Sequence, residues 1–205
     1  MNAIKVLFLY PNHKGNYMLP PAIGILSACL KKVGYEVDLF DTTQYASFEL
    51  EFRPKVDVDK SKGDRLMTKP FEENDYLKTN DGDIYEDWVD KVNTFKPDLI
   101  ALSATEDLWR SGISLLKRIR DKGILTIAGG VFPTFAPDLA IEYPEIDIVC
   151  KGEGEKAIVE LCNRLSKGTC YDDVPNLWIK KNKGIIIKNS LTQVEMNENP
   201  LIDLS

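Results

Sequence analysis

The chain has 205 residues, of which 43% are hydrophobic and 28% charged, and its formal net charge is -6. This composition is typical of a globular protein with one sizeable core. The acidic balance argues against nucleic acid or an anionic membrane as a partner, because phosphate binding requires clustered lysine and arginine. No apolar run approaches the roughly 20 residues of a membrane span.

The number and spacing of the cysteines indicate the redox environment of the protein. The four cysteines are Cys29, Cys150, Cys162 and Cys170, and they contain no closely spaced pair. A single histidine, His13, excludes most histidine-rich metal sites. We therefore expect reduced thiols in a cytoplasmic protein. The first apolar run, residues 4–10, is expected to be a strand and not a signal peptide.

The N-terminal part predicts a βαβ unit. Residues 4–10 form a strand closed by Pro11, and Pro20-Pro21 opens a helix that ends at Gly34. Residues 36–40 form the second strand, so the pair is parallel with a right-handed crossover. Residues 43–82 are polar and show no sustained period, which predicts a long insertion that is partly ordered. A helical pattern returns at 84–95.

From Pro97 the chain alternates regularly between strands and helices. The expected strands are 99–103, 124–128 and 146–150, and the expected helices are about 107–121, 137–143 and 155–165, with a hairpin over 177–187. This order predicts a flavodoxin-like three-layer α/β sandwich with five parallel strands in the order 2-1-3-4-5, plus the C-terminal β-hairpin. We expect one domain over 1–170, followed by a hairpin and linker over 171–205 that lead toward an absent domain.

Two of these strands end in small residues. Ser103-Ala104-Thr105 follows one apolar run, and Gly129-Gly130 follows the other. Open α/β sheets bind ligands just beyond the carboxyl ends of their strands. Small residues there allow a bulky ligand to lie against the backbone. The sequence thus predicts a slot for a large, partly flat ligand, near the switch point between the first and third strands.

Three common ligand types do not fit the loops. A dinucleotide site needs GxGxxG after the first strand, and a flavodoxin needs a phosphate loop rich in serine and threonine there. The loop from Pro11 to Tyr17 has neither. A phospho-receiver domain needs an aspartate where Ser103 stands and an acidic pair where Pro11-Asn12 stand. The site chemistry therefore excludes it.

Five further segments have an informative order and spacing: PPAIG at 20–24, VDLFD at 37–41, KPDLIALSAT at 96–105, AGGVFPT at 128–134 and DIVCKGEGE at 147–155. Taken together, they resemble the N-terminal cobalamin (vitamin B12)-binding domain of cobalamin-dependent radical SAM enzymes, such as the anaerobic magnesium-protoporphyrin IX monomethyl ester cyclase. The resemblance implies a cobalamin-binding module whose whole enzyme is a methyltransferase or cyclase. It also implies a C-terminal radical SAM domain with a four-iron four-sulfur cluster and S-adenosylmethionine. This chain would bind neither, because it lacks the CxxxCxxC motif.

The resemblance also implies which residues hold the nucleotide tail of cobalamin. They are Ser103, Ala104, Thr105, Gly129, Gly130, Val131, Pro133, Thr134, Gly152, Glu153 and Gly154. The hydroxyls after the third strand would donate to the benzimidazole nitrogen, and the glycines would let the tail pass close to the backbone. Two simpler interpretations remain open: Ser103 caps the next helix, and the glycines only form turns.

His13 departs from the classical cobalamin motif, Asp-x-His-x-x-Gly. Pro11 and Asn16 stand where the motif has its aspartate and glycine. We therefore expect an exposed loop residue and no protein ligand to cobalt, and no catalytic residue in this chain. The alternative function is a degenerate α/β module without cobalamin that contacts a substrate or a partner.

Overall fold

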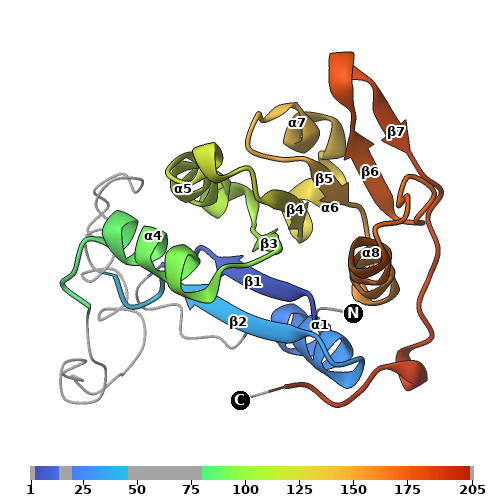
Figure 1. Ribbon diagram of the computed structural model, residues 1–205, viewed down its shortest axis with the longest axis horizontal. Helices are drawn as coiled ribbons and strands as arrows, with labels where there is room; N and C mark the ends of the chain where they lie inside the picture. Colours follow the sequence, from blue (N-terminus) through green and yellow to red (C-terminus); the bar gives the residue numbers. More distant parts are fainter. Residues whose placement is uncertain (1–2, 14–19, 46–79, 204–205) are drawn as a thin grey trace, which may run out of the picture.

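The computed structural model describes residues 3–13, 20–45 and 80–203, and its centre is one seven-stranded sheet of order β2-β1-β3-β4-β5-β6-β7 (Figure 1). The strands are β1 (Lys5–Tyr10), β2 (Glu36–Asp41), β3 (Leu99–Ser103), β4 (Leu125–Gly129), β5 (Ile148–Cys150), β6 (Leu177–Lys180) and β7 (Ile186–Lys188). The first five are parallel in the expected flavodoxin-like order. The hairpin of β6 and β7 extends the same sheet, because β6 pairs antiparallel with β5.

Helices cover both faces of the sheet. On one face lie α1 (Pro21–Lys32) and α8 (Glu155–Lys167), side by side in Figure 1. On the other face lie α4 (Ile84–Phe95), α5 (Glu106–Lys117) and α7 (Pro137–Glu142). The buried strands carry apolar residues on both faces, as a parallel sheet between two helical layers requires. The structure therefore confirms the three-layer architecture.

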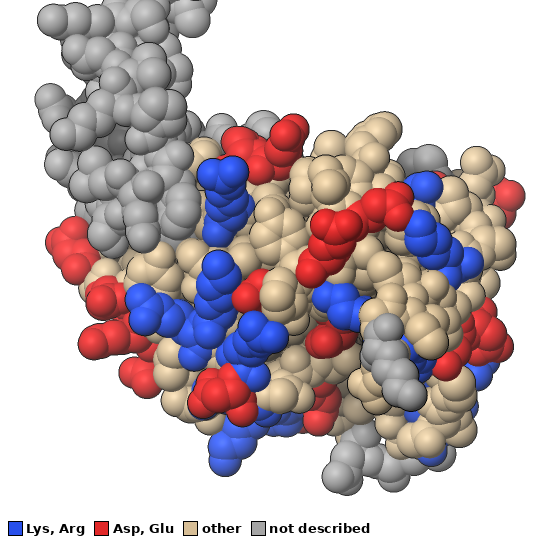
Figure 2. Space-filling view, turned by 90° about the horizontal axis from the view of Figure 1, so that it is seen from above, with Lys and Arg blue, Asp and Glu red and all other residues tan. Residues whose placement is uncertain are grey.

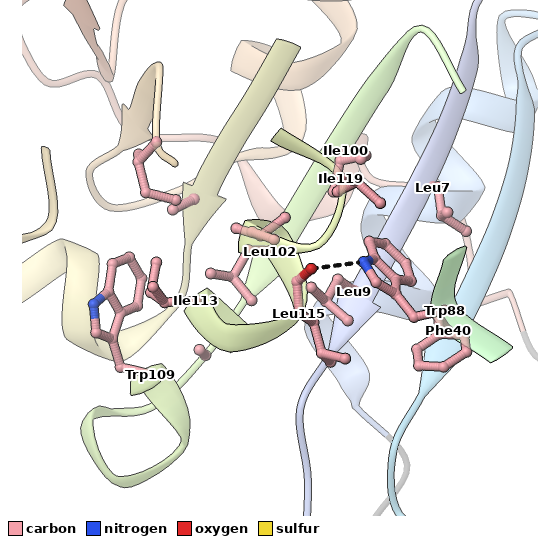
Figure 3. Packing of buried hydrophobic residues seen from close by; sticks show 14 of the residues in the cluster. Leu7, Leu9, Phe40, Trp88, Ile100, Leu102, Trp109, Ile113, Leu115 and Ile119 are labelled. Atoms are coloured by element: carbon pink, nitrogen blue, oxygen red, sulfur yellow. Dashed lines mark hydrogen bonds between the residues drawn. The ribbon is translucent and has the colours of Figure 1, made fainter. Parts of the chain in front are cut away.

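Aromatic packing anchors the α4–α5 layer on the sheet. Trp88 is fully buried, and its indole Nε1 donates a hydrogen bond of 3.0 Å to the backbone oxygen of Leu115 (Figure 3). The ring of Trp88 lies 5.1 Å from that of Phe40 on β2. Trp88 thus ties α4, α5 and β2 together, and its partnered N–H avoids the cost of a buried unsatisfied donor.

Some local elements differ from the expectations. A short helix, α6 (Val131–Phe135), follows β4 directly where only a loop was expected. The helix expected at 107–121 ends at Lys117, and a separate 3₁₀ turn, η2 (Arg120–Lys122), follows it. Most of the expected insertion, residues 46–79, lies outside the described residues.

The segment after β7 lies along the outside of α8 and α1. It passes through a 3₁₀ turn, η4 (Met196–Glu198), and Glu198 forms an ion pair of 2.7 Å with Lys156 on α8. Farther on, Asp203 accepts from the Ser27 hydroxyl and forms an ion pair of 2.6 Å with Lys31, both on α1. The part of the chain expected as a linker therefore contacts the domain over much of its length.

The surface has no large region of a single charge in the view of Figure 2, where lysine and arginine side chains lie among aspartates and glutamates. Among the helices of the described residues, none is long and apolar enough to cross a membrane.

Candidate functional site: a cavity at the carboxyl ends of β3, β4 and β5

A cavity of about 410 Å³ opens at the carboxyl edge of the sheet, on the face covered by α1 and α8. Its volume falls in the range of small-molecule sites. The residues that line it are Ala22, Leu26, Ala101, Leu102, Ser103, Ile127, Gly129, Gly130, Val131, Thr134, Phe135, Cys150, Gly152, Glu153, Gly154, Glu155 and Ile158. The lining is mostly apolar, and its polar side chains are those of Ser103, Thr134, Glu153 and Glu155.

The hollow exists because the facing positions on the sheet are small. Ala101 and Ser103 on β3 alternate with residues of the opposite face, and Ser103 pairs in register with Gly129 on β4. Cys150 completes the row on β5. Opposite this row stand larger side chains, Leu26 on α1 and Ile158 on α8. The cavity is therefore a gap between a floor of small residues and a wall of helices, beside β3, β4 and β5 and not between the first and third strands as expected.

The two consecutive glycines have different roles. Gly129 lies on β4, and a Cβ built on it would have Cys150 Cβ as its nearest neighbour, at an ordinary 3.8 Å. Gly130 has a φ of 103°, and a Cβ built there would lie 2.9 Å from the backbone oxygen of Ala104. Gly129 therefore leaves space in the cavity, whereas Gly130 allows the chain to turn tightly against the loop after β3.

The loop between β5 and α8 forms one side of the cavity mouth. Gly152 has a φ of 81°, and its N–H donates to the Thr134 hydroxyl at 3.2 Å. Gly154 is the N-cap of α8, and a Cβ on it would lie 3.3 Å from Leu26 Cδ2. Gly152 is thus a turn glycine, and Gly154 permits close packing of the loop on α1.

Most of the predicted site residues line the cavity: Ser103, Gly129, Gly130, Val131, Thr134, Gly152, Glu153 and Gly154. Ala104, Thr105 and Pro133 do not. The backbone of Ala104 packs against Gly130, and Pro133 is buried within α6. Thr105 is the N-cap of α5, and its hydroxyl donates to Asp107. Since α5 starts at Glu106, Ser103 is not its capping residue. No other described residue hydrogen bonds to the Ser103 hydroxyl, which leaves it available to a ligand.

Sequence reasoning missed the rest of the lining, which is apolar except for Glu155: Ala22, Leu26, Ala101, Leu102, Ile127, Phe135, Cys150, Glu155 and Ile158. Strand alternation could have found part of it, because Ala101 and Ile127 lie two residues before Ser103 and Gly129 and so share their face. The helical members could be found only from the packing of α1 and α8 on the sheet.

The expected exposure of His13 is wrong. The residue is only 8% exposed, and its Nε2 lies 3.8 Å from Oδ2 of Asp107 at the start of α5. Its backbone N–H donates to the side chain of Asn12, which in turn bonds to Thr43 after β2. Polar partners from two other loops therefore hold the loop after β1 against the sheet edge, a tertiary effect that the local sequence does not encode.

We expect His13→Ala to leave the absorption spectrum of bound cobalamin unchanged. The imidazole faces Asp107 and is not among the residues that line the cavity. Loss of a coordinated imidazole would shift the cobalt absorption bands, whereas loss of a packing residue would not. Visible spectra of the two proteins loaded with hydroxocobalamin decide the point. A shifted spectrum in the variant would make His13 a cobalt ligand.

The environment of the cysteine in the cavity favours its protonated thiol. Burial, and secondarily the carboxylate of Glu155, raise the pKa of the Cys150 thiol to about 12. Cys29 and Cys162 are also buried, and burial is the largest cause of their raised pKa values, whereas Cys170 is exposed. Among the described residues, no group of three or more His, Cys, Asp or Glu side chains is arranged to hold a metal ion.

We therefore expect iodoacetamide at pH 8 to alkylate the folded chain at Cys170 alone, because only an accessible thiolate reacts. Peptide mass spectrometry would locate the label, and the urea-unfolded chain, in which all four cysteines are accessible, is the control. Rapid labelling of Cys150 in the folded chain would contradict the buried position of its thiol.

A family model matches the part of the chain that carries most of this cavity. Residues 71–162, which include β3, β4, β5 and the loops that follow them, match the model of the B12 binding domain family. The chain is 28% identical over 180 residues to the anaerobic magnesium-protoporphyrin IX monomethyl ester cyclase of Rubrivivax gelatinosus, covering 83% of this chain and 26% of that protein. It is also 32% identical over 101 residues to an uncharacterized methyltransferase of Pyrococcus horikoshii, covering 48% of this chain and 22% of that protein.

A solved structure has the same fold. The cobalamin-dependent S-adenosylmethionine radical enzyme OxsB, with aqua-cobalamin and S-adenosylmethionine bound, superposes with a TM-score of 0.68 at 20% identity, covering 98% of this chain and 24% of that one. Residues 71–162 thus match the B12 binding domain family, and the chain has the fold of the corresponding part of OxsB. This confirms the resemblance seen in the sequence. The chain spans about a quarter of the length of these relatives.

Proposed function

We propose that this chain holds cobalamin by its nucleotide tail in the cavity at the carboxyl ends of β3, β4 and β5, as one module of a radical SAM methyltransferase or cyclase. The observation that carries the proposal is the coincidence of three features at one sheet edge. They are the cavity of about 410 Å³, the floor of small residues, and the match of this part of the chain to the B12 binding domain family.

The residues present fit a flat heterocycle attached to a sugar and a phosphate. The floor formed by Ala101, Gly129 and Cys150, together with the wall formed by Leu26 and Ile158, provides an apolar slot for the benzimidazole. Ser103 supplies a hydroxyl at the floor, where it would satisfy the ring nitrogen that burial removes from water. Gly154 and Glu155 at the start of α8 line the cavity, and backbone N–H groups at a helix start suit a ribose or phosphate.

Within the whole protein, bound cobalamin would supply the cobalt chemistry of methyl transfer or ring closure. The residues of this chain would bind and orient the cofactor and would not react. We propose that a radical SAM domain, with its four-iron four-sulfur cluster and S-adenosylmethionine, follows the hairpin and linker at 171–205 and covers the cofactor. The cofactor domain itself would comprise residues 1–170 together with the hairpin of β6 and β7, which completes its sheet.

Reconstitution tests the proposal. The purified 205-residue chain is mixed with hydroxocobalamin, desalted, and examined by visible absorption. We expect a corrinoid spectrum that survives desalting. Folded protein, verified by circular dichroism, that emerges colourless and gives no spectral change in a titration would overturn the proposal and favour a module that contacts a substrate or partner.

A further inference from the structure

One buried asparagine joins the loop at the cavity mouth to the C-terminal segment. Asn176 lies immediately before β6, is 3% exposed and has a φ of 67°. Asparagine tolerates this left-handed conformation better than most residues that have a side chain. Its backbone and side-chain groups all point to partners in two other parts of the chain.

Toward the cavity, Asn176 holds the loop between β5 and α8. Its backbone oxygen accepts from the N–H of Lys151 at 2.8 Å. Its side-chain Nδ2 donates to the backbone oxygen of Glu153 at 2.7 Å. These two bonds lie on either side of Gly152, the turn glycine of the loop.

Toward the C-terminus, the same residue holds the segment after β7. Its backbone N–H donates to the oxygen of Ser190 at 2.9 Å. The side chain bonds to both backbone groups of Thr192: Oδ1 accepts from its N–H at 2.6 Å, and Nδ2 donates to its oxygen at 3.0 Å. Two residues later the N–H of Val194 donates to the carboxylate of Glu153. The segment after β7 thus also bonds directly to the loop between β5 and α8.

We propose that Asn176 is a positioning residue for cofactor binding: it fixes the loop 151–154 against the segment 190–194 and so sets the shape of the cavity mouth. The inference rests on the proposed function. The loop has no regular structure, so these bonds, together with the one from Gly152 to Thr134, restrain it between β5 and α8 in the described part of the chain. A loop already ordered in its binding shape loses less entropy when the ligand arrives, and the affinity is correspondingly higher.

Two substitutions of Asn176 distinguish the effect of its side-chain hydrogen bonds from the effect of its backbone conformation. Asn176→Asp keeps the size but replaces the amide donor with a carboxylate that faces the oxygens of Glu153 and Thr192. Asn176→Gly removes the side chain and is compatible with the left-handed backbone. It therefore tests the loss of the side-chain bonds without straining the fold. We expect both to weaken hydroxocobalamin binding by about tenfold or more, the effect of about 1.4 kcal/mol of lost interaction.

Asn189→Asp is the matched control. The amide of Asn189 also donates to two backbone oxygens, those of Asp172 at 2.8 Å and Val174 at 2.9 Å, but it does not contact the cavity loop. Substitution there removes the same kind of bonds from a neighbouring part of the hairpin. Its expected effect is a lower melting temperature with cobalamin affinity close to that of the unaltered chain.

A second readout does not require cobalamin. Amide hydrogen exchange in the cofactor-free chain should accelerate at 151–154 and 190–194 in both Asn176 variants and stay unchanged there in Asn189→Asp. If both Asn176 variants bind as tightly as the control, or the loop exchanges at its original rate, the inference is wrong. If the unaltered chain fails to bind cobalamin, the proposed function fails, and the exchange rates alone decide whether Asn176 holds the loop.

Discussion

Gly129→Val is expected to abolish the retention of hydroxocobalamin while the sheet stays intact. A Cβ at this position meets Cys150 Cβ at 3.8 Å, an ordinary contact, so the backbone accepts the side chain. Valine also suits a strand. Its methyl groups would then occupy the floor of the cavity beside Ser103. Spectral titration should show at least about a hundredfold weaker binding, which corresponds to about 2.7 kcal/mol.

The graded control is Gly129→Ala, which adds only the Cβ and should reduce affinity by a smaller factor. Thermal melting of both variants verifies that the fold is retained. Equal cobalamin affinity in Gly129→Val and the unaltered chain would mean that the tail of the cofactor does not enter this cavity.

Substitution of Gly130 should instead destabilise the fold itself. We expect Gly130→Val to lower the free energy of unfolding by roughly 3 kcal/mol or more, because two costs combine. The φ of 103° is strained for a residue with a side chain, at about 1–3 kcal/mol. The new Cβ would also lie 2.9 Å from the backbone oxygen of Ala104, and such overpacking costs about 1–3 kcal/mol. Urea unfolding monitored by tryptophan fluorescence measures the loss.

Gly123→Ala is the matched control for the backbone strain. Gly123 also has a positive φ, 63°, but a Cβ there meets nothing within 4 Å. The difference between the two variants therefore contains the contact with Ala104, together with the larger side chain and the φ of 103° at residue 130. If Gly130→Val unfolds at the same urea concentration as Gly123→Ala, the tight turn between the loops after β3 and β4 is not a restraint on the fold.

The sheet could be predicted from the sequence because its strands are short apolar runs that end in small or turn-forming residues. The run at 99–103 and the helix at 84–95 match β3 and α4 at both ends. The helix α6 was missed because it has only five residues and contains Pro133, which local propensity disfavours. Topology alone predicts which edge of the sheet carries the site, since parallel strands bring their carboxyl ends together.

Details that depend on packing between distant segments could not be predicted. The placement of Leu26 and Ile158 over the strands sets which part of the edge is hollow. The burial of His13 accompanies contacts of its loop with Thr43 and Asp107, which lie 30 and 94 residues farther along the chain. The sequence alone does not distinguish the roles of Gly129 and Gly130. They differ because a Cβ on Gly130 would meet the backbone of Ala104, whereas a Cβ on Gly129 would not.

The two ends of the sheet also determine how the domain behaves toward other copies of itself. At one end β2 carries Glu36 and Asp38, which form ion pairs with Lys5 at 3.0 Å and Lys91 at 2.6 Å. At the other end β7 is only three residues long, and its Lys188 forms an ion pair of 2.6 Å with Asp138. Charged and very short edge strands are poor templates for strand addition. Both edges of this sheet thus disfavour self-association through β-strands, and this protection against aggregation belongs to the domain itself, independent of any cofactor.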